Sequence, residues 1–122
     1  MHQFLRYSLI LGLFIVLAAC GKQEEQILLF GQITDDNQES IENAKAELAE
    51  LGKSQHFLTR FTENTQVFTE DSLQQYAALI FMHTSGDVLD DVQRADVERF
   101  QQAGGGVMGI EALPEIQQAW PW

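Results

Sequence analysis

The sequence has 122 residues, with 7 lysines and arginines against 18 aspartates and glutamates, 3 histidines and 1 cysteine. The length allows one domain at most. The formal net charge of −11 argues against a nucleic-acid binder, because clustered cations hold phosphate backbones. A single cysteine excludes a disulfide framework within the chain and a zinc finger built on several thiolates.

The first twenty residues have the pattern of a bacterial export signal. Arg6 precedes a short apolar run over 9–17, and small residues follow that run. This order is typical of a signal peptide, and the apolar run is shorter than a membrane-spanning helix requires. Residues 17–20, Leu-Ala-Ala-Cys, resemble the lipobox of bacterial lipoproteins, which implies a signal peptide over 1–19 and a lipid on Cys20. The alternative is an uncleaved N-terminal anchor with an incidental cysteine.

Lipidation of Cys20 would decide both the location and the chemistry of the protein. Several acyl chains give stable anchoring, whereas the acidic body would be repelled by anionic headgroups. Gly21 follows the cysteine, and resemblance to sorting in Gram-negative bacteria then implies the outer membrane, facing the periplasm. Residues 20–26 are expected to form the lipidated cysteine and a polar tether. A thioether on Cys20 excludes cysteine catalysis and redox chemistry.

Four apolar runs predict strands in the body of the chain, at 27–30, 56–61, 77–82 and 107–110. The first helix is expected to begin at caps within 35–37, with capping-box spacing from Asp36 to Glu39, and to stop at Gly52. Its predicted inward face consists of Ile41, Ala44, Leu48 and Leu51.

Two further helices are predicted between the later strands. Thr69 is expected to cap a short helix that runs through Tyr76. Asp90, with Gln93 three residues later, predicts the cap of the next helix, and the glycines at 104–106 predict its end. The predicted inward face of this last helix consists of Val92, Ala95, Phe100 and Ala103.

This alternation of strands and helices predicts an α/β fold: an open parallel sheet with flanking helices, in the flavodoxin-like order 2-1-3-4. Function is then expected at the carboxyl ends of the strands, which are 31–37, 62–65, 83–87 and 111–114. The fourth strand would leave an unpaired apolar edge. Together with the tryptophans at 120 and 122, this edge predicts that the domain is truncated or that a partner covers it. The alternative is that both tryptophans fold back onto the domain.

Three ordered motifs resemble the ThuA-like (trehalose utilisation) family. They are FMHTSGDVL at 81–89, FQQAGGGVMGI at 100–110 and WPW at 120–122. The resemblance covers about residues 27–122 and implies a fold related to class I glutamine amidotransferases, without their nucleophilic cysteine. It also implies a domain of about double this length, of which the chain would be the N-terminal half, and a role in sugar or keto-sugar metabolism.

Two histidines typical of the family are absent from this chain. Members carry an Arg-His pair before the start of the first helix, where this sequence has Asn37 and Gln38. Members also carry a histidine after the fourth strand, where this sequence has Glu111. Two imidazoles that could act as bases or ligands are therefore missing, and both an active and an inactive domain stay open.

The turn after the third strand contains the residue types of a catalytic triad, His83, Ser85 and Asp87. Three residues on one tight turn seldom place a base within reach of the nucleophile with an acid behind it. The favoured interpretation is a loop whose hydroxyls and carboxylate satisfy backbone donors. With Thr84 and Glu111, these side chains could also hydrogen-bond a sugar.

No cofactor and no metal are predicted. Gly104, Gly106 and Gly109 match GxGxxG, but they follow a helix and enter a strand, the reverse of the dinucleotide-binding context. A hard cation could be held by carboxylates, but capping and solvent exposure are the favoured interpretation. The carboxylates concerned are Asp35, Asp36, Glu39, Asp87 and Glu111.

Three functions stay open. The first is a lipid-anchored, carbohydrate-binding domain, active or inactive, that binds a sugar at the strand ends. The second is a protein-interaction module that uses the fourth-strand edge with Trp120 and Trp122, although these rings could equally stack on a sugar. The third is a hydrolase that uses His83 and Asp87. His56 is predicted to be a surface residue.

Overall fold

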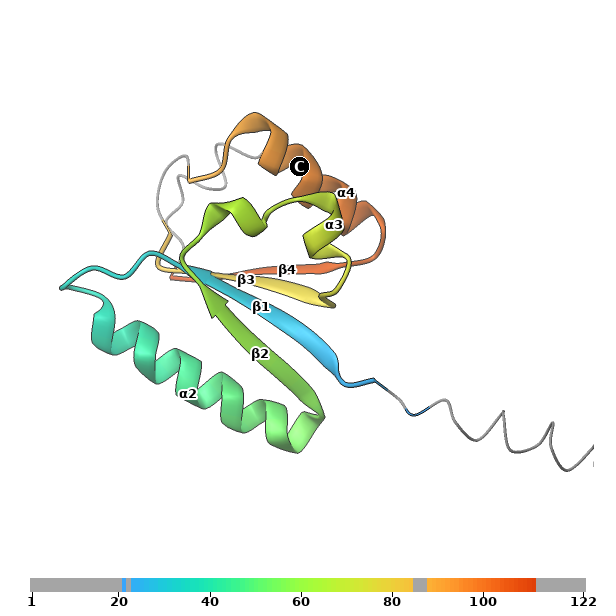
Figure 1. The fold of residues 1–122 in the computed structure, drawn as a ribbon. Helices are drawn as coiled ribbons and strands as arrows, with labels where there is room; N and C mark the ends of the chain where they lie inside the picture. The colour runs from blue at the N-terminus through green and yellow to red at the C-terminus, as the bar shows by residue number, and fades with distance from the viewer. Residues whose placement is uncertain (1–20, 22, 85–87, 112–122) are drawn as a thin grey trace, which may run out of the picture.

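Four parallel strands form one sheet, with helices on both of its faces (Figure 1). The computed structural model describes residues 21, 23–84 and 88–111. In chain order the elements are β1 Glu25–Gly31, α2 Gln38–Gln55, β2 Phe57–Thr62, the 3₁₀-helix η1 Thr65–Val67, α3 Glu70–Leu73, β3 Ala78–Met82, α4 Asp91–Gln102 and β4 Gly106–Ile110.

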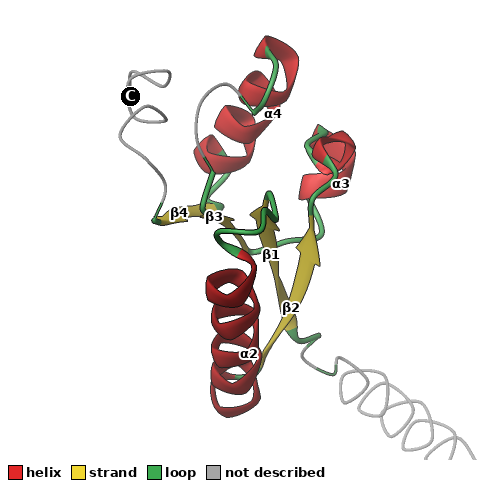
Figure 2. Cartoon of the chain, turned by 90° about the vertical axis from the view of Figure 1, so that its left-hand side faces the viewer, coloured by secondary structure: helices red, strands yellow, loops and turns green. Residues whose placement is uncertain are grey.

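The strands follow the order β2-β1-β3-β4, and every neighbouring pair is parallel, so the predicted α/β fold and strand order are confirmed. Helix α2 covers one face of the sheet, and α3 and α4 cover the other (Figure 2). β1 and β3 lie in the middle because their apolar side chains are buried on both faces, which is the environment that continuous apolar runs require.

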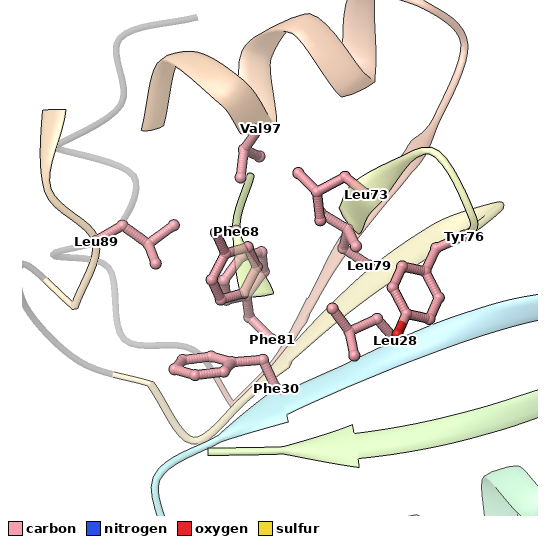
Figure 3. Packing of buried hydrophobic residues seen from close by; sticks show 9 residues of the cluster. All are labelled: Leu28, Phe30, Phe68, Leu73, Tyr76, Leu79, Phe81, Leu89 and Val97. Atoms are coloured by element: carbon pink, nitrogen blue, oxygen red, sulfur yellow. The ribbon is translucent and has the colours of Figure 1, made fainter. Parts of the chain in front are cut away.

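Alternate residues of the central strands enter two separate cores. Leu28 and Phe30 of β1 face α4, and Leu29 between them faces α2. The core on the α4 side surrounds three phenylalanines (Figure 3). Phe30 packs edge-on against Phe68 and Phe81, with centroid distances of 5.1 and 5.8 Å, and Phe68 and Phe81 stack at 5.5 Å. Burial on both faces therefore fixes the positions of β1 and β3.

The first helix begins where predicted but ends later. Its N-cap is Asn37, within the predicted 35–37, but Asn37 makes no side-chain capping bond, and the predicted capping box from Asp36 to Glu39 is not formed. At the other end the helix continues through Gly52 to Gln55, and His56 caps it in the left-handed conformation, with φ of 63°. Gly52 is buried because β2 passes over it, and Leu51 is 48% exposed rather than inward.

The helices on the opposite face are partly as predicted. Thr69 caps α3 by accepting from the backbone N–H of Ser72, but α3 ends at Leu73. Asp90 and Gln93 form the predicted capping box of α4. The predicted inward face of α4 is wrong in part, because Val92 is 71% exposed and Val97 is the fully buried residue. Ala103 is the exposed C-cap.

The predicted signal peptide over 1–19, Cys20, Trp120 and Trp122 lie outside the described residues. Among the residues that the structure describes, no helix is both long and apolar enough to cross a membrane. Within the same part of the chain, β4 pairs with β3 alone and Met108 is 57% exposed. A partner at this edge stays a prediction.

Candidate functional site

The ends of β3 and β4 bring His83 and Glu111 to the same edge of the sheet. Met82 pairs with Ile110, and the N–H of His83 donates to the carbonyl of Ile110 at 3.1 Å. Both residues then leave their strands in the left-handed region, with φ of 47° for His83 and 48° for Glu111. Such values are uncommon for residues other than glycine. The two adjacent strand ends therefore turn in the same unusual way.

The imidazole of His83 contacts side chains from two other elements. Its Nε2 lies 2.9 Å from Oγ of Ser40, in the first turn of α2, and 3.1 Å from Oε2 of Glu111. The His83 side chain is 17% exposed, and the Glu111 side chain is 66% exposed. We refer to Ser40, His83 and Glu111 as the His83 cluster. It joins the start of α2 to the ends of β3 and β4.

The loop between β1 and α2 holds Ser40 in place. Oδ1 of Asn37 accepts from the Thr34 N–H at 2.7 Å, and Nδ2 of Asn37 donates to the Gln32 carbonyl at 2.8 Å. The N–H of Ile33 donates to Oε1 of Glu63 at 2.6 Å, which ties this loop to the residue after β2. Asn37 therefore shapes the loop before α2, where the family resemblance would place an arginine.

The His83 cluster has the residue types of a serine-histidine-acid triad but lacks its geometry. In a triad the hydroxyl and the acid bind different nitrogens of the imidazole. Here Ser40 and Glu111 both contact Nε2. The ring therefore cannot take a proton from Ser40 at one nitrogen while Glu111 orients it at the other. The arrangement provides hydrogen-bonding groups and offers no activated serine.

The other predicted site residues differ in where they lie. Thr84 is fully buried, and its Oγ1 has no hydrogen-bond partner among the described residues. Ser85, Asp87, Trp120 and Trp122 lie outside the described residues. A hydrolase that uses His83 and Asp87 stays a prediction.

The carboxylates considered for a cation do not assemble within the described chain. Asp35, Asp36 and Glu39 are all exposed, and Glu111 contacts His83. Across residues 21, 23–84 and 88–111, no group of three or more histidine, cysteine, aspartate or glutamate side chains could hold a metal ion. These carboxylates therefore provide no metal site in that part of the chain.

Sequence analysis missed Ser40 as a member of the site. A serine in the first turn of a helix is ordinary, because serine satisfies backbone groups there. Ser40 could have been predicted from its place in the fold, because in a parallel sheet the start of the helix after β1 lies at the same edge as the ends of β3 and β4. That topology brings together Ser40 and His83, which are 43 residues apart in the chain.

Comparisons with known proteins agree with this fold. The solved structure of a protein described as ThuA-like, from Bacteroides uniformis ATCC 8492, superimposes with a TM-score of 0.59 at 21% sequence identity. The match covers 73% of this chain and 37% of that protein, so the matched part spans well under half of its neighbour's length. No curated protein matches the chain. The sequence model of the ThuA family, described as trehalose utilisation, matches residues 26–122, and the chain therefore belongs to the ThuA family.

Proposed function

We propose that the protein is a lipid-anchored domain that binds carbohydrate at the His83 cluster. The observation that carries the proposal is the contact of His83 Nε2 with Ser40 and Glu111 at the carboxyl edge of the sheet. A hydroxyl, an imidazole and a carboxylate together supply donors and acceptors for the hydroxyl groups of a polyol. The edge is also where open α/β sheets bind ligands. The family's description as trehalose utilisation supports the ligand class.

Binding rather than turnover is the activity that the cluster supports best. Nucleophilic catalysis needs a base that accepts the proton of the attacking hydroxyl. At Nε2 of His83, Glu111 competes with Ser40 for the same nitrogen. We therefore assign the cluster a recognition role and assign no catalytic residue.

The proposed anchor and the proposed site lie at opposite ends of β1. The strand begins at Glu25, five residues after Cys20, and ends at Gly31. Seven residues in β geometry span about 20 Å, at about 3.3 Å per residue. A lipid on Cys20 would hold the start of β1 near the bilayer and leave the His83 cluster on the far side. This arrangement supports a ligand site open to the periplasm.

Sugar binding is tested by amide NMR of the full chain in detergent micelles, titrated with trehalose, glucose and a keto-sugar. We expect shifts at the His83 cluster, and we expect His83→Asn to weaken binding by about tenfold or more, because it removes a largely buried hydrogen-bonding ring.

The matched control is His56→Asn, the same substitution at the other described histidine with positive φ. Asparagine tolerates this backbone region, so both variants keep their local conformation. His56→Asn should bind as the wild type does. Spectra unmoved by every sugar, or equal binding by both variants, would rule out this site.

The anchor is tested by intact mass and membrane fractionation in a Gram-negative host. We expect the wild type to begin at lipidated Cys20 and to sediment with membranes. We expect Cys20→Ser to carry no lipid and to leave the outer-membrane fraction, because one cysteine supplies the only thioether position. An unmodified Cys20 in the wild type would overturn the proposed anchoring.

A further inference from the structure

We propose that Glu111 is a positioning residue that keeps the proton of His83 on Nε2, so that Nδ1 accepts a hydroxyl group of a polyol ligand. The ligand class rests on the proposed function, whereas the position of the proton rests on contacts within the chain. The contact that carries the inference is the 3.1 Å separation between Nε2 of His83 and Oε2 of Glu111.

The position of the proton follows from what each group can donate. An ionised carboxylate has no hydrogen and only accepts. A lone pair on Nε2 would be repelled by a carboxylate oxygen 3.1 Å away, whereas a hydrogen on Nε2 is attracted to it. Glu111 therefore favours the tautomer in which Nε2 of His83 carries the hydrogen. In the neutral ring the lone pair then lies on Nδ1, which becomes the acceptor.

The same reasoning defines what Ser40 does. Its Oγ lies 2.9 Å from Nε2, a nitrogen whose lone pair is no longer available when Nε2 carries the hydrogen. Ser40 can then accept a share of the Nε2–H but cannot donate to it. The hydroxyl hydrogen of Ser40 stays available for a second group. Among the described residues, the cluster thus offers Nδ1 as an acceptor and the Ser40 hydroxyl as a donor, and a polyol hydroxyl can use either.

The backbone explains why Glu111 reaches His83. The His83 N–H binds the carbonyl of Ile110, the residue directly before Glu111. Both His83 and Glu111 then adopt positive φ. Sparsely populated backbone conformations of this kind gather at ligand sites, where the surrounding structure enforces them. Here the strand ends enforce the contact between a largely buried imidazole and an exposed carboxylate.

The experiment reads the tautomer directly from imidazole ¹⁵N chemical shifts of the full chain in detergent micelles, at a pH where the ring is neutral. Exposed His56 is the internal reference. We expect the ratio of Nε2–H to Nδ1–H in His83 to exceed that of His56 by about fivefold, the effect of a modest electrostatic attraction between Nε2–H and the nearby carboxylate. In Glu111→Gln this excess should be lost, and affinity for the sugar that shifts the wild-type spectrum should fall by a similar factor.

Ser40→Ala is the matched control, because it removes the other contact of Nε2 and leaves the carboxylate. It should retain the excess of Nε2–H. A wild-type ring protonated on Nδ1, or a Glu111→Gln ratio equal to that of the wild type, would overturn the role of Glu111. If sugars shift the wild-type spectrum but Glu111→Gln has the same ratio of Nε2–H to Nδ1–H in His83 as the wild type, this inference is overturned and the proposed function stands. If Glu111→Gln lowers that ratio but no sugar shifts the wild-type spectrum, the proposed function is overturned and the tautomer assignment stands.

Discussion

Replacing Phe30 with alanine is expected to lower the free energy of unfolding by about 3–5 kcal/mol. Phe30 is 1% exposed and packs edge-on against both Phe68 and Phe81. The substitution removes the transfer free energy of a buried ring and leaves a cavity beside two rings that face each other. The change is measured by chemical denaturation followed by far-ultraviolet circular dichroism.

Two variants separate this effect from a general cost of mutating the sheet. Phe30→Leu keeps most of the apolar volume and should cost less than half as much as the alanine variant. Leu58→Ala lies on β2 at a side chain that is 52% exposed, and it should change stability by about 1 kcal/mol at most. If Phe30→Ala cost no more than Leu58→Ala, the three-phenylalanine core would not stabilise the fold.

The strands and their order could be predicted because burial on both faces leaves a direct mark on the sequence. A strand with helices on both sides needs apolar residues at successive positions, and 27–30 and 77–82 have them. Short connections and right-handed crossovers then leave few possible orders. The edge strand β2 carries a weaker signal for the same reason, since the side chains of Phe57–Phe61 alternate between partly buried and exposed.

The helix boundaries were less predictable because contacts between distant elements decide them. A glycine at the end of an apolar pattern is typical of a helix C-terminus, yet Gly52 lies inside α2. The residue that ends the helix is His56, whose type gives little indication of a positive φ. In α4, Val92 and Val97 are equally apolar, and only the place of α4 over the sheet decides which is buried.

In the candidate site, too, the residues at strand ends could be predicted, whereas the residue brought in by a contact between distant elements was not. The rule that ligands bind at the carboxyl ends of parallel strands points to His83 and Glu111 from the sequence alone. It gave no reason to choose Ser40, because the first turn of α2 reaches His83 only through the loop that Asn37 and Glu63 fix. The residue types on one turn suggested Ser85 and Asp87 as partners of His83, and both lie outside the described residues. The described residues supply two partners from other elements, Ser40 and Glu111.

Replacing Gly52 with alanine is expected to destabilise the protein by about 1–3 kcal/mol, the usual cost of inserting a carbon into a packed site. In an exposed helix interior the same change stabilises by about 1 kcal/mol, because alanine has the highest helix propensity. At Gly52 the added Cβ would lie 2.4 Å from the carbonyl oxygen of Phe57 and 3.2 Å from its ring. That oxygen belongs to the backbone of β2 and cannot rotate away, so the strand or the helix must shift.

Ala49→Gly, at an exposed position of the same helix, is the matched control for helix propensity. It should cost about 1 kcal/mol, the ordinary difference between alanine and glycine. The expected result is therefore that opposite substitutions three residues apart in α2 both destabilise, as measured by chemical denaturation. A more stable Gly52→Ala variant would mean that α2 does not press against β2 there. Loss of stability in both would show that the close approach of these two elements, rather than helix termination, requires glycine at position 52.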